Sequence, residues 1–160
     1  MTRPVVSGMN VYDNGSHMTV KIKRLSPDAK IPKYAHGPDE DAGLDLCSVE
    51  HAELEPGAVC AVATGLSIEL PPGYEAQVRP RSGLALKKAV TVANAPGTID
   101  PAYRGEIKVI LINLGREPFI VEPGDRIAQM VVARYEAIEW EESELSGTSR
   151  GVGGFGSSGR

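Results

Sequence analysis

Four Pro-Gly pairs divide this chain into short apolar runs, and this punctuation restricts the fold more than any other feature. The pairs are Pro56-Gly57, Pro72-Gly73, Pro96-Gly97 and Pro123-Gly124. Proline fixes φ and glycine opens the region of positive φ, so each pair favours a tight turn. Around them lie runs rich in small or branched apolar residues, at 20–25, 58–64, 66–70, 107–113 and 126–133. Short strands separated by such turns predict an all-β sandwich or barrel.

One segment departs from the strand pattern. Residues 82–88 contain good helix formers behind a candidate N-cap, Ser82, so we expect one short helix there. Arg79 and Arg81 place two guanidinium groups beside the free N–H groups of this helix start, which makes a candidate anion site. The alternative is that the arginines pair with surface carboxylates and that Ser82 only caps the helix.

Length and charge limit the classes of protein that the chain can belong to. With 160 residues it fits a single domain, in which we expect a disordered N-terminal extension at 1–17, a folded body at 18–145 and a flexible Gly-rich arm at 146–160. A formal charge of -4 disfavours a nucleic-acid partner, because duplex binders need a concentrated basic face. The same charge means that a phosphorylated ligand requires local cations or a metal ion.

The cysteines and the hydropathy of the chain indicate the cellular compartment in which the protein works. Cys47 and Cys60 lack metal-type spacing, and nothing before them resembles a secretory signal. No apolar run approaches the roughly 20 residues of a membrane span. These features predict reduced thiols in a cytoplasmic protein without a membrane partner.

The segment 94–106 carries the strongest local chemistry. Two turns enclose one carboxylate, Asp100, and one aromatic ring, Tyr103, with further polar groups at Asn94 and Thr98. A chain folded this tightly presents backbone N–H and C=O groups with which a planar polar ligand could pair. The alternative is a β-hairpin in which Asp100 only satisfies a turn.

The C-terminal segment supports two interpretations. Its glycines are typical either of a plain linker or of a backbone that wraps phosphates, and Arg150 with Phe155 favours a lid. Before it, the acidic stretch 139–144 surrounds Trp140. We expect a solvated connector that Trp140 anchors against the body.

Three acidic positions remain. Asp41 and Asp45 are four residues apart at the start of a strand, where both can point to one face. Either could assist Mg²⁺, which usually takes one or two carboxylates together with waters and phosphates. Asp125 is expected to pair with an arginine.

Five segments in order resemble the motifs of the trimeric deoxyuridine triphosphatase (dUTP diphosphatase) family; they lie at 41–46, 80–85, 94–108, 124–129 and 150–158. The resemblance implies a jelly-roll-like β-barrel subunit in a homotrimer, with active sites between subunits and Mg²⁺ as cofactor. It also implies hydrolysis of dUTP to dUMP and diphosphate, which lowers dUTP and supplies dUMP for dTTP synthesis.

The resemblance assigns roles to individual residues. Asp100 would be the general base that activates water, Asp45 would hold Mg²⁺ through a water, and Tyr103 would pack on the deoxyribose. In this family the arm usually reaches a neighbour's site. The other substrate-binding residues would grip the phosphates, read the uracil edge or close over the nucleotide: Arg81, Ser82, Gly83 and Gln129; Asn94, Gly97, Thr98, Ile99 and Lys108, together with Asp100; and Arg150, Phe155, Gly156, Ser157 and Ser158.

Two alternatives stay open. A dCTP deaminase, or a bifunctional deaminase, shares the fold, but it carries a catalytic Glu a few residues beyond the glycine that matches Gly105. This chain has the apolar run 109–111 there, which disfavours deamination. The second alternative is a non-catalytic nucleotide-binding regulatory trimer, which predicts binding without turnover.

Overall fold

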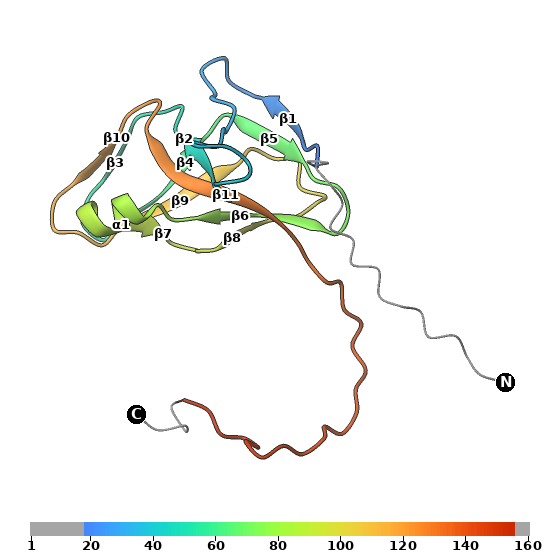
Figure 1. Ribbon diagram of the computed structural model, residues 1–160. Coiled ribbons are helices and arrows are strands. Elements are labelled where there is room, and N and C mark those ends of the chain that lie inside the picture. The colour runs from blue at the N-terminus through green and yellow to red at the C-terminus, as the bar shows by residue number, and fades with distance from the viewer. Residues whose placement is uncertain (1–17, 156–160) are drawn as a thin grey trace.

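The computed structural model describes residues 18–155, which form eleven strands and one short helix (Figure 1). The all-β prediction with a single helix is confirmed. Residues 1–17 and three predicted arm residues, Gly156, Ser157 and Ser158, lie outside the described residues. The elements are β1 Lys21–Arg24, β2 Leu44–Cys47, β3 Ala52–Leu54, β4 Val59–Ala63, β5 Leu66–Glu69, β6 Tyr74–Arg79, α1 Ser82–Lys88, β7 Val90–Val92, β8 Gly97–Ile99, β9 Lys108–Asn113, β10 Phe119–Val121 and β11 Arg126–Arg134.

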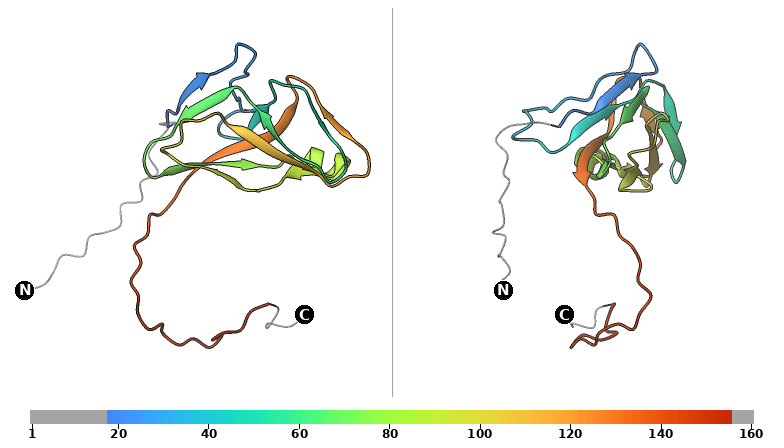
Figure 2. Two further views of the ribbon diagram at one scale, coloured as in Figure 1. Left: turned by 180° about the vertical axis from the view of Figure 1, so that it is seen from behind. Right: turned by 90° about the vertical axis from the view of Figure 1, so that its right-hand side faces the viewer.

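Antiparallel pairs assemble these strands into four small sheets around one core. The sheet orders are β2-β11-β6-β8, β4-β9-β7, β1-β5 and β10-β3, and Figure 2 shows them wrapped around a common interior. Every sheet contributes fully buried side chains to the same cluster, as a barrel-like body requires. These side chains include Leu46, Leu54, Leu66, Leu111 and Ile127.

Alternation along β9 shows why these sequences form strands. Val109, Leu111 and Asn113 point inward and are buried, whereas Lys108 and Ile112 point outward. This is the period-two pattern of a strand with one face on the core. The same strand pairs with β4 on one side and with β7 on the other, so it is the central strand of its three-stranded sheet.

The helix lies where the sequence predicts it, but its cap differs. Ser82 is the first helical residue and not the N-cap, so that expectation was wrong. Arg81 occupies the cap position with an extended backbone, and its carbonyl accepts the N–H groups of Leu84 and Ala85, both at 3.1 Å. The carbonyl of Arg81 therefore starts the helix, and no side chain caps it. Within the described residues, no helix has the length and apolar character needed to cross a membrane.

The chain leaves the body after β11. Residues 135–155, which we call the C-terminal tail, contain no helix or strand and run away from the body (Figure 1, Figure 2). Trp140 is 90% exposed, so the prediction that it anchors the chain against the body was wrong for this single subunit. Its acidic neighbours favour solvent.

Asn113 is the polar residue on which the turn between β9 and β10 depends. Its side chain is fully buried, and its amide donates to the Leu54 carbonyl at 2.9 Å and to the Glu117 carbonyl at 2.8 Å. Its side-chain oxygen accepts the N–H of Gly115 at 2.8 Å. One side chain therefore satisfies three backbone groups and joins the turn to β3.

We predict that Asn113→Ala lowers the free energy of unfolding by about 2–4 kcal/mol, because three buried backbone groups lose their partner. Urea denaturation at fixed protein concentration measures the change. Arg116→Ala is the matched control, since Arg116 is exposed on the same turn. Equal, small effects of both substitutions would contradict the role assigned to Asn113.

Candidate active site

Three of the five motif segments meet around one carboxylate. Asp45 on β2 lies 3.2 Å from Arg81 Nε and 3.1 Å from Arg126 Nη1. Arg81 Nη1 also donates to the Arg126 carbonyl at 3.0 Å. Gln129 on β11 pairs with Asp45 of β2 on one side and with Arg79 of β6 on the other. Its side-chain amide donates to the Pro80 carbonyl at 2.9 Å. We call Asp45, Arg81, Arg126 and Gln129 the arginine cluster.

The arginine cluster carries a local positive charge in an acidic protein. Two guanidinium groups share one carboxylate, which leaves one positive charge over. The Arg81 and Asp45 side chains are 25% and 29% exposed, so solvent screens their interaction only in part. Ser82 and Gly83 lie exposed beside them at the first two positions of the helix. The arrangement can hold an anion such as a phosphate group.

Sequence reasoning missed two members of this region. Arg126 pairs with Asp45, whereas Asp125, expected to pair with an arginine, instead accepts the backbone N–H of Glu122 at 2.9 Å and closes a turn. Sequence reasoning missed the pair of Arg126 and Asp45 because these residues lie 81 positions apart in the chain. Gly43 is the second: a Cβ there would overlap the Gln129 side chain, so only glycine leaves room for that amide.

Asp41 is occupied elsewhere. Its carboxylate accepts the backbone N–H of His36 at 2.7 Å and contacts the His36 ring at 3.1 Å. The backbone bond, followed by the ring contact, lowers the pKa of Asp41 below its ordinary value. Asp41 and Asp45 thus have different partners, and Asp45 is the carboxylate next to the candidate phosphate site.

A second group of predicted residues lies on the segment 94–108, which contains β8, the loop after it and the start of β9. We call this segment the hairpin, although β8 pairs with β6 and β9 pairs with β4 and β7. Asp100 follows β8 and is exposed, and its carbonyl accepts the N–H of Tyr103 at 3.1 Å. Among the described residues its carboxylate has no side-chain hydrogen bond or ion pair. The Tyr103 hydroxyl donates to the Glu106 carbonyl at 2.9 Å, over Gly105, where a Cβ would meet the ring. Asn94 packs against Gly97 at the other end of β8.

A cavity lies beside the hairpin, and hydrogen bonds connect the hairpin to the body. A cavity of about 340 Å³ is lined by three predicted residues, Thr98, Tyr103 and Lys108, together with Ala61, Glu106, Ile107 and Ile110. These hydrogen bonds join the hairpin to the segment 64–66. Glu106 Oε1 accepts the N–H of Gly65 at 2.9 Å, and the N–H of Ile107 donates to Leu66 at 2.7 Å. The hairpin is therefore positioned by the core and not by its own turn alone.

The structure places Asp100 and the arginine cluster toward opposite ends of β6, with the start of β8 between them. Arg79, next to the arginine cluster, pairs with Gln129, whereas Ala76 pairs with Ile99, so Asp100 follows at the level of Glu75. Four residues of extended chain separate Glu75 from Arg79, which is roughly 13 Å. Arg81 lies beyond Arg79. A single subunit thus does not bring Asp100 together with the arginine cluster.

The tail forms a third group, which also stays apart. Arg150 Nε donates to the Gly153 carbonyl at 2.8 Å, and Phe155 is exposed. In the described part of the tail beyond Tyr135, backbone hydrogen bonds link only tail residues to one another.

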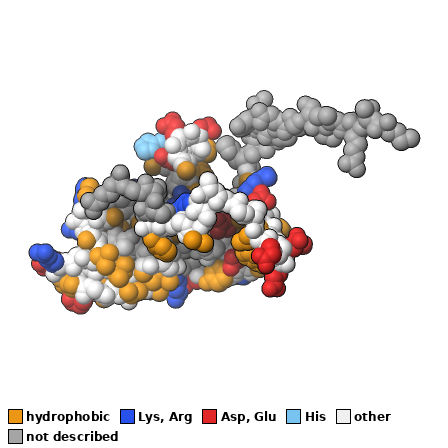
Figure 3. Space-filling model, turned by 90° about the horizontal axis from the view of Figure 1, so that it is seen from below, with side chains coloured by type: hydrophobic (Ala, Val, Ile, Leu, Met, Phe, Trp, Pro, Cys, Tyr) orange, Lys and Arg blue, Asp and Glu red, His pale blue; other side chains and the backbone are white. Residues whose placement is uncertain are grey.

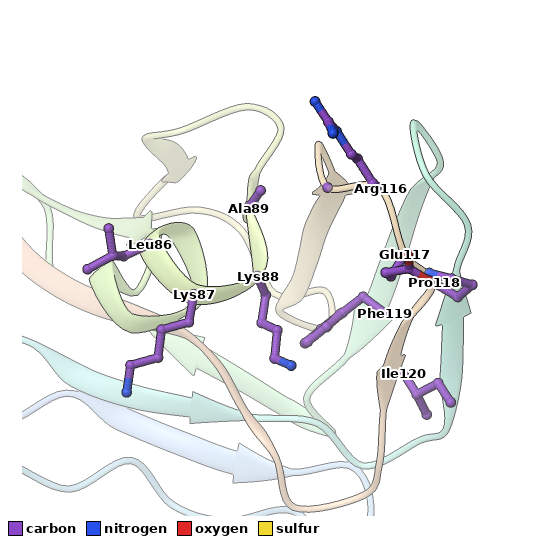
Figure 4. A pocket seen from close by; sticks show the side chains of 10 residues that line it. Leu86, Lys87, Lys88, Ala89, Arg116, Glu117, Pro118, Phe119 and Ile120 are labelled. Atoms are coloured by element: carbon purple, nitrogen blue, oxygen red, sulfur yellow. The ribbon is translucent and has the colours of Figure 1, made fainter.

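A larger hollow contains none of the predicted residues. It measures about 600 Å³ and lies between the end of α1 and the turn before β10 (Figure 4). Its lining includes Lys87, Lys88, Arg116 and Phe119. The candidate site is therefore defined by chemistry and not by cavity size.

The donor set for a metal ion is small. In residues 18–155 no three His, Cys, Asp or Glu side chains gather in a way that could hold a metal. Asp45 is a single carboxylate beside a candidate phosphate site, with both oxygens already paired to arginines. This set fits a Mg²⁺ ion that arrives with phosphates and waters, and it does not fit an ion held by protein groups alone.

Known proteins resemble this chain over most of its length. The dUTPase family model matches residues 28–159. The deoxyuridine 5'-triphosphate nucleotidohydrolase of Solibacter usitatus is 63% identical over 145 residues, which cover 91% of this chain and 99% of that one. A structure of the Staphylococcus bacteriophage 80alpha dUTPase with dUPNHPP has a TM-score of 0.81 at 28% identity, covering 89% and 99% of the two chains. A mutant dUTPase from phage phi11 of S. aureus, described with a structural Mg(II) ion, has a TM-score of 0.74 at 23% identity over 82% and 100%.

Proposed function

Because the chain belongs to the dUTPase family, we propose that it hydrolyses dUTP to dUMP and diphosphate, and so lowers dUTP and supplies dUMP for dTTP synthesis. The observation that carries the proposal is the exposed carboxylate of Asp100 on a hairpin that the core positions. A base must reach a water molecule, and a carboxylate already paired with an arginine would be a poor one.

Each group of residues performs one part of the reaction. Asp100 takes a proton from the water that attacks the α-phosphate. Arg81, with Ser82 and Gly83, neutralises and orients the phosphate chain, and Gln129 supports the α-phosphate. When bound, Mg²⁺ supplies further neutralisation of the phosphates, and Asp45 would hold it through a water.

The hairpin provides selectivity. Asn94 and the backbone of Gly97–Ile99 and Asp100, together with Lys108, pair with the uracil edge, and Tyr103 packs on the deoxyribose where a 2′-hydroxyl would sit. Cytosine presents a donor where uracil presents an acceptor, so buried backbone groups would lose partners. The Gly-rich arm then closes with Arg150, Gly156, Ser157 and Ser158 over the γ-phosphate, and Phe155 stacks on uracil.

We propose further that the site forms between subunits of a homotrimer. The order of the residues along β6 disfavours a site formed by one chain. Asp100 lies farther from Arg81 than Gly97 does, because Gly97 pairs with Val78 whereas Ile99 pairs with Ala76. The base that must reach the α-phosphate would then lie toward the end of β6 that is opposite the phosphate grip. A neighbouring subunit can supply the grip from another direction.

The surface supports assembly. Large apolar side chains are exposed on the body, among them Val59, Leu114 and Ile120, and Figure 3 shows apolar atoms gathered on one face. Such faces usually mark contacts with other chains. We place the enzyme in the cytoplasm, where its two free cysteines would stay reduced. Burial raises the pKa of the Cys47 thiol, which favours the protonated form.

The proposed activity is tested by offering dUTP, dCTP, dTTP and UTP with Mg²⁺ and measuring release of diphosphate. We expect dUTP to exceed each competitor by at least about a hundredfold in kcat/KM, because the site pairs with the base edge. Release of ammonia from dCTP would point to the deaminase alternative. Binding of dUTP without any turnover would point to the regulatory trimer.

The role of Asp100 is tested by Asp100→Asn. We expect kcat to fall by about 10²–10⁴-fold while the affinity for a non-hydrolysable dUTP analogue is retained, because only the base is lost. Asp28→Asn is the control, since Asp28 is exposed and distant in sequence from all three groups. An unchanged kcat in Asp100→Asn would exclude this residue as the base.

Sharing of the site is tested by mixing two inactive variants, Asp100→Asn and Arg81→Ala, after joint unfolding and refolding. If base and grip come from different chains of a trimer, about a quarter of the sites in random mixtures combine both intact groups. Each variant refolded alone is the control. A mixture as inactive as its components would show that one chain supplies both groups.

A further inference from the structure

The body holds the C-terminal chain for the last time at one corner of the β2-β11-β6-β8 sheet. Arg134, the final residue of β11, pairs with Tyr74, the first residue of β6. The N–H of Tyr135 then donates to the Gly73 carbonyl at 3.1 Å. From 136 to 152 every residue is exposed, and the backbone bonds that follow lie within the tail. The direction in which the tail leaves is therefore set at this corner.

Two side chains reinforce this corner. Arg134 Nε donates to the Tyr74 hydroxyl at 2.8 Å, and the guanidinium carbon lies 5.2 Å from the centroid of the Tyr74 ring. Tyr74 is half-buried, and its N–H donates to the Pro71 carbonyl at 3.3 Å. Gly73 has a φ of 83°, so the turn before Tyr74 is tight. A fixed aromatic ring thus holds an exposed arginine in one orientation.

We propose that Arg134 and Tyr74 form a clasp that fixes the starting point and direction of the tail. They are positioning residues for the hydrolysis of dUTP, since they act through Arg150 and Phe155 and touch no substrate. The inference rests on the proposed function, in which these two residues close over the bound nucleotide.

The effect follows from chain statistics. Arg150 lies 16 residues beyond Arg134. Over such a distance the local concentration of a tethered group depends on where the tether starts and how many residues move freely. Without the clasp, the end of β11 can separate from β6, which lengthens the free tether and widens its directions. Arg150 would then meet the phosphates less often.

The clasp predicts a change in tail mobility that needs no substrate. Trp140 is the chain's single tryptophan, lies six residues beyond Arg134 and is 90% exposed. We expect Arg134→Ala to lower the steady-state fluorescence anisotropy of Trp140 and to leave the melting temperature unchanged. Arg116→Ala is the matched control, because Arg116 is an exposed arginine on the turn before β10. Equal anisotropy in wild type and Arg134→Ala would overturn the clasp.

Activity supplies the second measurement. In the full chain we expect Arg134→Ala to lower kcat/KM for dUTP about three- to tenfold, as the local concentration of Arg150 falls. In a chain lacking residues 146–160, assayed at high enzyme concentration, the same substitution should change nothing. Arg134→Lys and Tyr74→Phe each keep half of the contact and should give intermediate losses.

The outcomes separate the clasp from the proposed function. An equal loss in the full and the shortened chains would mean that Arg134 supports the body, and the clasp would be overturned. A wild-type chain that releases no diphosphate from dUTP would overturn the proposed function and, with it, the role of the clasp in hydrolysis. Even then, the anisotropy of Trp140 decides whether the clasp holds the tail.

Discussion

The hydrogen-bonded ladder of β6 sets the spacing of three features of this subunit: the approach to the arginine cluster, the hairpin and the start of the tail. At one end Arg79 pairs with Gln129 and brings the chain to Arg81; in the middle Ala76–Val78 carries the substrate hairpin; at the other end Tyr74 meets Arg134. Antiparallel strands have a fixed register because a slip of one residue would turn buried side chains to solvent. Ala76 and Val78 are buried, so the spacing of the three groups cannot drift.

Local patterns of the sequence predicted the elements well, and long-range pairings account for what they missed. Pro-Gly turns and apolar alternation are local signals, and the strands and helix follow them closely. The cap at Arg81 and the choice of Arg126 over Asp125 depend on contacts between distant segments. Trp140 shows the same limit, since an aromatic residue indicates burial without indicating which surface covers it. The motifs predicted which residues carry the chemistry, whereas the separation of Asp100 from Arg81 within one chain follows from the strand register.

The local charge of the arginine cluster explains how an acidic protein could bind a highly charged anion. The chain has a formal charge of -4, yet Arg81 and Arg126 share only Asp45. In the free protein this carboxylate keeps the arginines in place and reduces their mutual repulsion. An arriving phosphate chain offers the arginines more negative charge than Asp45 does, which would release the carboxylate toward a hydrated cation. In the proposed reaction, Asp45 would thus pair with the guanidinium groups in the free protein and with a hydrated Mg²⁺ ion once the phosphates are bound.

The proposed division of the site among chains would have a consequence for selectivity. The hairpin that we propose to read the base carries Asp100, whereas the proposed phosphate grip, which every nucleoside triphosphate could satisfy, lies at the other end of β6. A phosphate chain held by the arginine cluster alone meets no base, so other triphosphates can bind there without being cleaved. In the proposed reaction, hydrolysis would require that a ligand reach both groups at once, and only a base that fits the hairpin would place its α-phosphate beside Asp100. Separation of the two groups along β6 would therefore make recognition of the base a condition for catalysis.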